Sequence, residues 1–196
     1  MLALQAGVSR GIFSSEAGLG SAPIAAAAAK SDVPGRQALI SMSSVFLTSF
    51  IVCTITGLVI VVTGTLGEFG PDGSFLNGSV LALRSFQKII PGGDIIVTIS
   101  LILFAYSTIL GWAYYGEKCM EYLFSEKIIK LYRIIFIVSL VLGAVLSLDV
   151  VWSFANIANG LMAFPNLIGL IGLAGVAAYE TQGFEKLLLS EKKTCR

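Results

Sequence analysis

The chain has 196 residues, of which 56% are apolar and only 13% are charged, and its mean hydropathy is +0.87. This apolar excess is too large for one packed core of this length, so the composition excludes an ordinary soluble domain and indicates a membrane protein. Thirteen basic residues nearly balance twelve acidic ones, and nothing in the charge pattern points to nucleic acid as a partner.

The reactive residue types narrow the function classes further. The sequence has no histidine, the commonest pH switch and metal ligand. Cys53, Cys119 and Cys195 stand far apart in no metal-binding or disulfide spacing, so we expect free thiols. No grouping of nucleophile, base and oxyanion donor can be read, which argues against an enzyme. Met1 is followed by no basic region and cleavage site, so we expect no signal peptide.

The first predicted element covers residues 1–29 and is a broken transmembrane helix. The run from Arg10 to Pro23 places an arginine, a glutamate and three serines in an otherwise apolar chain, and its three glycines and final proline favour a backbone that leaves helical geometry. At membrane depth an opened backbone is tolerated only where it lines a cavity or is buried in protein. Broken helices of this kind hold solutes and coupling ions in secondary transporters.

Uncharged intervals locate four further crossings, because a helix needs about 20 apolar residues to span a bilayer. We predict transmembrane helices over residues 37–64, 94–116, 134–148 and 150–179. The third is short, but flanking aromatic and charged residues can extend it at the interfaces. The fourth contains Asn159-Gly160 and Pro165, and we interpret it as one kinked crossing rather than a hairpin.

The connections set the predicted orientation. Ten basic residues fall in the first loop, in the loop 117–133 and in the tail 180–196, whereas only Arg84 and Lys88 fall in the connection 65–93. By the positive-inside rule the first group is cytoplasmic and the 65–93 loop external. This loop contains a rough helical stripe, which fits a short helix over an external vestibule or an ordinary amphipathic loop helix.

Several long motifs carry a resemblance to a known family. They are RGIFSSEAGLGSAPIAAAAA from Arg10, FAYSTILGWAYYGE from Phe104, EYLF from Glu121 and GLMAFPN from Gly160. The first closely resembles the signature RG-x-FSNEAG-x-GSAP of the alanine or glycine:cation symporter family, and the resemblance extends from Ala6 to about Val176. It implies an all-α, multi-pass membrane protein with the amino acid–polyamine–cation superfamily fold.

The same resemblance implies that this chain is the C-terminal half of a transporter. Family members are about twice as long and fold as two inverted repeats of five helices. The chain matches the second repeat and begins inside its first, broken helix, which is therefore truncated. Binding in such folds occurs between the repeats. We therefore expect a split or truncated gene, or a partner chain that carries the missing first repeat.

The unwound part of the broken helix is the first candidate binding segment. The resemblance implies substrate contacts from Phe13, Ser14, Ser15, Glu16, Ala17, Gly18 and Gly20, with Phe13 bordering the side-chain pocket and a half-helix N-terminus favouring the carboxylate. A close-packing face of small residues is the structural alternative. The residue types of Arg10 and Glu16 are equally compatible with direct solute contact, with an ion pair between the two side chains, and with a position at the membrane interface.

The predicted helix 94–116 supplies the second candidate segment. By resemblance to the superfamily, the carbonyl of Phe104 and the hydroxyls of Ser107 and Thr108 belong to a sodium site, and Ile109 and Trp112 border the substrate. The alternative is that the two hydroxyls bond back to carbonyls of their own helix, which is common in membranes. Trp112 fits an interfacial or packing position nearly as well.

Three positions depart from the family pattern. Ser15 stands where the family usually has asparagine, Thr48 where it has aspartate, and Asn156 where it often has aspartate. Each change removes a carboxylate or an amide, which puts cation coupling and substrate choice in doubt but not the fold.

From the sequence we expect the C-terminal half of a sodium-coupled symporter that imports alanine or glycine. We place it in the cell inner membrane with a cytoplasmic C-terminus, with sodium as coupling ion and no other cofactor. The alternative is a non-transporting remnant or membrane subunit that packs against partner helices.

Overall fold

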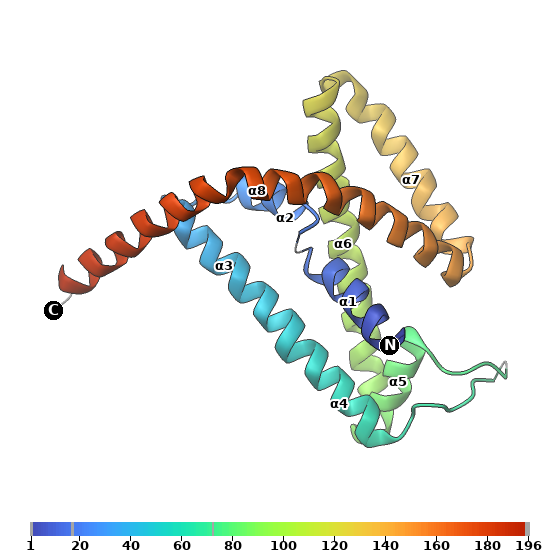
Figure 1. Cartoon of the computed structure of the whole chain (residues 1–196). Coiled ribbons are helices and arrows are strands. Elements are labelled where there is room, and N and C mark those ends of the chain that lie inside the picture. Colours follow the sequence, from blue (N-terminus) through green and yellow to red (C-terminus); the bar gives the residue numbers. More distant parts are fainter. Residues whose placement is uncertain (1, 17, 72, 195–196) are drawn as a thin grey trace. The chain divides into compact units, whose positions relative to one another are not determined.

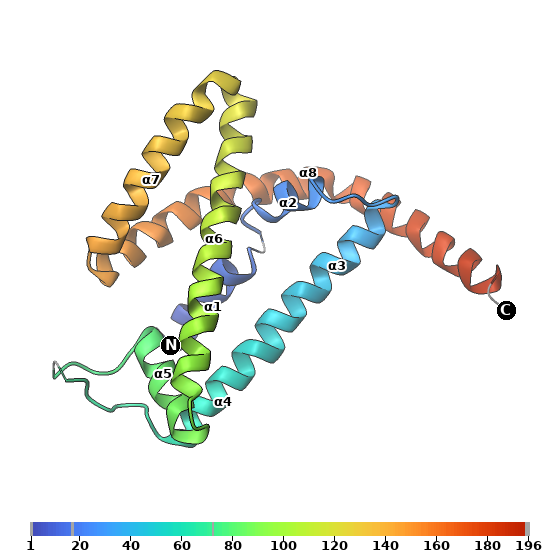
Figure 2. The same cartoon turned by 180° about the vertical axis from the view of Figure 1, so that it is seen from behind.

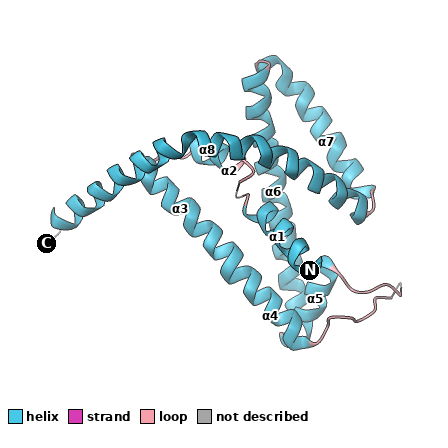
Figure 3. Ribbon diagram, viewed as in Figure 1, coloured by secondary structure: helices cyan, strands magenta, loops and turns pink. Residues whose placement is uncertain are grey.

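The computed structural model describes residues 2–16, 18–71 and 73–194, and these fold almost entirely into helices (Figure 3). Within them no strand is present, and Phe69 and Phe75 form an isolated antiparallel bridge. The α-helices, labelled in Figure 1, are α1 Leu2–Ser15, α2 Ala22–Ala27, α3 Pro34–Phe46, α4 Cys53–Thr63, α5 Gly78–Ile89, α6 Gly93–Leu123, α7 Ile129–Val145 and α8 Leu148–Thr194. A π-helix, η1 Leu47–Val52, joins α3 to α4, and a 3-10 turn, η2 Glu126–Ile128, precedes α7.

The chain divides into two compact units, which are described separately. Unit 1 comprises residues 1–45 and 115–196, and unit 2 comprises residues 46–114.

Among the described residues, four helical stretches are long and apolar enough to cross a membrane. They are Pro34–Thr63, Gly93–Leu123, Glu126–Val145 and Leu148–Lys193. The predicted crossings 94–116 and 150–179 fall within these stretches, whereas 37–64 and 134–148 overlap them and run slightly past their ends at Thr63 and Val145. Most of the large apolar side chains of these stretches are exposed in the isolated chain, as expected of helices that face lipid or a partner.

Two helices extend beyond the ends that the charge pattern suggested. Helix α6 continues to Leu123, into the expected 117–133 loop, and α8 continues to Thr194, through most of the expected 180–196 tail. The added residues are rich in Glu, Lys and Leu, which are good helix formers, and contain no proline. A charged residue marks the end of an apolar interval but does not end a helix.

The first segment is interrupted. Helix α1 ends at Ser15 and α2 begins at Ala22, with Pro23 in its first turn, where the missing proline N–H costs nothing. Helix α2 has only six residues. By contrast, α8 runs through Asn159-Gly160 and Pro165 as one continuous helix, and Figure 1 shows its ribbon bending without a break.

In unit 1, the end of α6 and the start of α7 form a close hairpin, which Figure 2 shows from behind. A Cβ placed on Gly116 would lie 1.9 Å from the hydroxyl oxygen of Tyr132, so glycine permits the approach. Beside it, Arg133 makes a bidentate pair with Glu117, with Nε to Oε1 at 2.5 Å and Nη2 to Oε2 at 2.9 Å. This planar, two-bond geometry is the stronger form of an ion pair.

The start of α3 and the end of α8 also meet within unit 1. A Cβ on Gly35 would lie 2.3 Å from the ring of Phe184. Arg36 bonds to Asp32 at 2.7 Å and also pairs with Glu191, which is 155 residues away in sequence. The C-terminal part of α8 is therefore attached to the start of α3.

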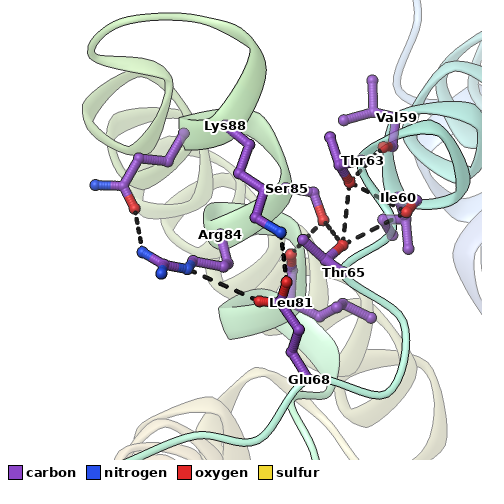
Figure 4. Close-up of polar contacts among 10 residues, drawn as sticks. Val59, Ile60, Thr63, Thr65, Glu68, Leu81, Arg84, Ser85 and Lys88 are labelled. Atoms are coloured by element: carbon purple, nitrogen blue, oxygen red, sulfur yellow. Dashed lines mark hydrogen bonds and ion pairs between the residues drawn. The ribbon is translucent and has the colours of Figure 1, made fainter.

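Unit 2 contains a polar corner between α4 and α5, shown in Figure 4. Thr65 and Ser85 are fully buried, and their hydroxyl oxygens lie 2.6 Å apart. Because the Ser85 hydroxyl donates to the carbonyl of Leu81 at 2.7 Å, the Thr65 hydroxyl is the donor to Ser85. We refer to Thr65, Ser85 and the chain between α4 and α5 as the corner. At its rim, Glu68 pairs with Lys88 and lies 4.0 Å from Arg84.

Candidate functional site

The interruption of the first helix follows from its backbone angles. Glu16, Gly18 and Gly20 have φ values of +55°, +81° and +84°, so the chain cannot continue as a right-handed helix. The glycines adopt this region at little cost, whereas a residue with a Cβ is strained there. We call residues 16–21 the unwound segment. A turn within it is closed by the N–H of Leu19, which donates to the carbonyl of Glu16 at 3.2 Å.

The carboxylate of Glu16 is bound by groups of the protein. It accepts a hydrogen bond from the hydroxyl of Ser21 at 2.8 Å and another from the side chain of Tyr115. Ser21 and Leu19 are buried, with 2% and 3% of their surfaces exposed, while Glu16 and Tyr115 are half-buried. A half-buried carboxylate needs such donors, because an uncompensated charge is costly there.

Helix α8 contributes the other contacts around α1 and the unwound segment. A Cβ on Gly20 would lie 3.0 Å from Oδ1 of Asn166, which follows Pro165. Further along α8, the ring of Trp152 makes an edge contact with Phe13, with centroids 6.0 Å apart and planes at 79°. The guanidinium of Arg10 lies over the same indole ring, 3.5 Å from its centroid, in cation–π geometry.

A cavity of about 580 Å³ lies between α1 and α8, within unit 1. It is large compared with a small amino acid and has a mixed lining. The hydroxyl of Ser9 donates to Oδ1 of Asn156 at 3.1 Å at this cavity. The lining residues are Leu4, Gln5, Val8, Ser9, Ile12, Leu19, Asn156, Asn159, Gly160 and Ala163.

The second group of predicted site residues lies on α6 in unit 2. The hydroxyl of Ser107 donates to the carbonyl of Phe104 at 3.0 Å, which is the back-bonded geometry expected as the alternative to a sodium site. Phe104 and Ile109 are exposed, and Trp112 is half-buried. Thr108 belongs to the same unit as these residues, whereas the unwound segment belongs to unit 1.

The remaining predicted residues include two serines at the end of α1. Ser14 is exposed, and the hydroxyl of Ser15 bonds back to the carbonyl of Gly11 at 2.8 Å. Ala17, a predicted substrate contact, lies outside the described residues, as does Cys195. Thr48, a departure from the family pattern, lies in the π-helix η1, an irregularity that is frequent at functional sites.

Sequence reasoning missed several residues that surround the unwound segment. Tyr115 and Asn166 lie inside motifs that were quoted for the resemblance, but nothing in their spacing indicates contact with residues 16–21. Ser21 could have been identified as a residue at a helix start, because a serine before Ala-Pro is typical of that position. Its hydroxyl does not cap α2, however, and binds Glu16 instead.

Known proteins resemble this chain over nearly its whole length. Residues 1–195 match the model of the sodium:alanine symporter family. Among curated relatives, the sodium/alanine symporter AgcS of Methanococcus maripaludis is 56% identical over 97% of this chain and 42% of its own length. The amino-acid carrier protein AlsT of Bacillus subtilis is 36% identical over 87% of this chain and 36% of its own.

A third relative, the probable sodium/glutamine symporter GlnT of Bacillus subtilis, is 36% identical over 89% of this chain and 36% of its own length. The chain thus spans about two-fifths of the length of the curated relatives it matches. No solved structure matches it significantly. The family match covers nearly every residue, including the unwound segment and α6, and the chain therefore belongs to the sodium:alanine symporter family.

Proposed function

We propose that this chain forms the C-terminal part of a sodium-coupled importer of alanine or glycine. The observation that carries the proposal is the interrupted first helix, in which Glu16, Gly18 and Gly20 take positive φ values inside an apolar chain. Opened backbone of this kind supplies N–H and C=O groups that can bind the charged ends of a small amino acid. The names of two relatives, which specify sodium with alanine or with glutamine, support sodium-coupled import of an amino acid.

The amino acid would bind through residues 13–20. The backbone of the unwound segment supplies the polar contacts, and Phe13, held in place against Trp152, borders the side chain of the solute. Ser14 is exposed and can offer its hydroxyl, whereas the hydroxyl of Ser15 must leave the carbonyl of Gly11 to do so. Because α2 has only six residues, its dipole is a minor contribution.

The sodium ion would bind to α6. The carbonyl of Phe104 and the hydroxyls of Ser107 and Thr108 are oxygen ligands, which a hard cation prefers. The bond from Ser107 to Phe104 is compatible with this role, because both oxygens keep a lone pair for a cation. Ile109 and Trp112, on the same helix, are the proposed substrate contacts of this group.

Sodium entry can drive concentration of the solute. One cation that moves down a membrane potential of 100 mV releases about 2.3 kcal/mol, which corresponds to roughly fifty-fold accumulation before any sodium gradient is added. We infer from the distribution of basic residues that the C-terminus lies in the cytoplasm, with the protein in the cell inner membrane. The remaining ligands would come from a first five-helix repeat, which these 196 residues do not include.

Uptake of labelled alanine into proteoliposomes tests the proposal. The chain is reconstituted together with a chain that supplies the first repeat, with and without a sodium gradient. We expect saturable uptake that requires sodium and is competed by glycine. Absence of both sodium-dependent uptake and sodium-dependent alanine binding would overturn the proposal and favour the non-transporting membrane subunit.

Thr108 variants test the sodium assignment in the same preparation. Thr108→Ala removes one proposed ligand and keeps helix propensity, so the half-saturating sodium concentration should rise about tenfold, while insertion stays normal. Thr108→Ser keeps the oxygen and should retain a value near that of the parent. Equal half-saturating concentrations in all three proteins would remove Thr108 from the site.

A further inference from the structure

We propose that Glu16 is a positioning residue, which holds the unwound segment in its binding geometry through Ser21 and Tyr115 and leaves solute contact to its neighbours. The inference rests on the proposed function of this segment. It gives a structural role to the one acidic residue of the segment. The residue type alone was compatible with either solute contact or pairing within the protein.

The first support is that Glu16 connects the two sides of the interruption. It directly follows α1, and its Oε2 accepts from Ser21, which directly precedes α2, at 2.8 Å. A serine at this position normally caps the helix, because its side-chain oxygen accepts a hydrogen bond from a backbone N–H of the first turn. Here Ser21 makes no side-chain cap bond. Its buried hydroxyl donates to the carboxylate instead.

The second support is the bond from Tyr115. This half-buried tyrosine lies on α6, so its hydroxyl attaches the unwound segment to a helix distant in sequence. Bonds to a charged acceptor are the stronger class of hydrogen bond. With Ser21 on one side and Tyr115 on the other, the carboxylate is held by two donors from different elements.

The third support is the backbone of Glu16 itself. Its φ of +55° is unfavourable for a residue with a Cβ, and such a conformation persists only where the surroundings hold it. The carbonyl of Glu16 accepts from Leu19, whose side chain is 3% exposed, and Gly20 lies directly against Asn166. The two side-chain bonds complete a set of contacts that maintains this geometry before any solute arrives.

A buried reporter measures this geometry without solute. The three native cysteines are replaced by alanine and Leu19→Cys is introduced, so that a permeant maleimide reacts only when the unwound segment opens. Labelling is followed in the full chain in lipid nanodiscs without alanine or sodium. We expect slow labelling of this parent, and labelling about tenfold faster or more in Glu16→Ala and in Tyr115→Phe.

The variants separate positioning from other roles. Glu16→Gln keeps one acceptor oxygen and should restore a rate between those of the parent and Glu16→Ala. The double variant Glu16→Ala with Tyr115→Phe should label no faster than Glu16→Ala, because both changes remove the same bond. Tyr122→Phe is the matched control, since Tyr122 lies on the same helix and is 90% exposed, and it should leave the rate unchanged.

Labelling rates equal to that of the parent in both Glu16→Ala and Tyr115→Phe would overturn the inference. Weaker alanine binding with an unchanged labelling rate would show instead that Glu16 contacts the solute. Should Glu16→Ala fail to insert, Tyr115→Phe, which removes a single oxygen, decides alone. A parent that takes up no alanine would contradict the proposed function, while the labelling rates would still test the role of Glu16.

Discussion

The unwound segment in unit 1 and the corner in unit 2 both interrupt apolar helices with polar groups, but they differ in how those groups are satisfied. In the corner, two fully buried hydroxyls bond to each other and to helix carbonyls. In the unwound segment, a half-buried carboxylate accepts from Ser21 of the same segment and from Tyr115 of α6, and Glu16, a residue with a Cβ, takes a positive φ. The buried contact of the corner is made by two neutral hydroxyls, whereas the segment places a strained non-glycine backbone at Glu16, which also carries the carboxylate.

This difference indicates which polar region of a membrane protein is a candidate for function. Buried hydroxyls that satisfy each other at a helix connection are explained by folding alone. Strained backbone supported by a charged side chain has no such explanation, because a regular helix would be more stable there. The two regions should therefore respond differently to substitution.

The largest effect is expected at Gly20. Gly20→Ala introduces a Cβ at a φ of +84° and 3.0 Å from Oδ1 of Asn166, so it combines backbone strain with a steric contact. We expect it to lower the free energy of unfolding by about 2–3 kcal/mol, measured by SDS titration in mixed micelles. It should also abolish alanine uptake.

Two other glycines serve as controls for Gly20. Gly18→Ala meets no atom within 4 Å but has a φ of +81°, so it isolates the backbone strain, about 1–2 kcal/mol. Gly11→Ala lies within α1 in open space and should be neutral or slightly stabilising. Equal effects of all three changes would contradict the distinction between the unwound segment and a regular helix.

The next largest effect is expected in the corner. Thr65→Val leaves the buried Ser85 without its donor and should destabilise the protein by about 1–3 kcal/mol. The double variant Thr65→Val with Ser85→Ala should cost less than the sum of the two single changes. Each single change leaves one buried hydroxyl without its partner, whereas the double change removes both hydroxyls. Neither variant should change the half-saturating alanine or sodium concentration, and a shifted concentration would give the corner a functional role.

A smaller effect is expected at Arg10. Arg10→Gln removes the cation over the Trp152 ring but keeps a side chain of similar length, so it should cost about 0.5–1 kcal/mol. Tryptophan fluorescence should report the change in the environment of Trp152. An unchanged spectrum in a background with Trp112→Phe would contradict the stacking of Arg10 on this ring.

The smallest effect is expected at the rim of the corner. Lys88→Ala removes the ion pair with Glu68, both partners of which are about one-third exposed, and should cost less than about 1 kcal/mol. The residual effect should decrease further as salt is raised, because salt screens exposed charges. A loss as large as that of Thr65→Val would show that the ion pair, rather than the buried hydroxyls, stabilises the corner.

Part of this fold and site could be predicted from sequence. Glycine spacing and Pro23 predict where the first helix stops, because both act locally on the backbone. Helix ends at Leu123 and Thr194 could not be read from charge, since helix propensity continues past the apolar interval. The partners of Glu16 required knowledge of which helices meet, and Tyr115 lies far from it in sequence. The π-helix around Thr48 leaves no comparable local signal.

Helix α8 has 47 residues and, at 1.5 Å per residue, a length of roughly 70 Å, more than twice the hydrocarbon thickness of a bilayer. A change of direction at one point along so long a helix is therefore enlarged at its end. About 43 Å of it lies beyond Pro165, so a tilt of about 5° at that residue displaces Thr194 by roughly 4 Å. Because Glu191, near this far end, pairs with Arg36, a small rotation beside Asn166 and Gly20 would move the start of α3 by several ångströms.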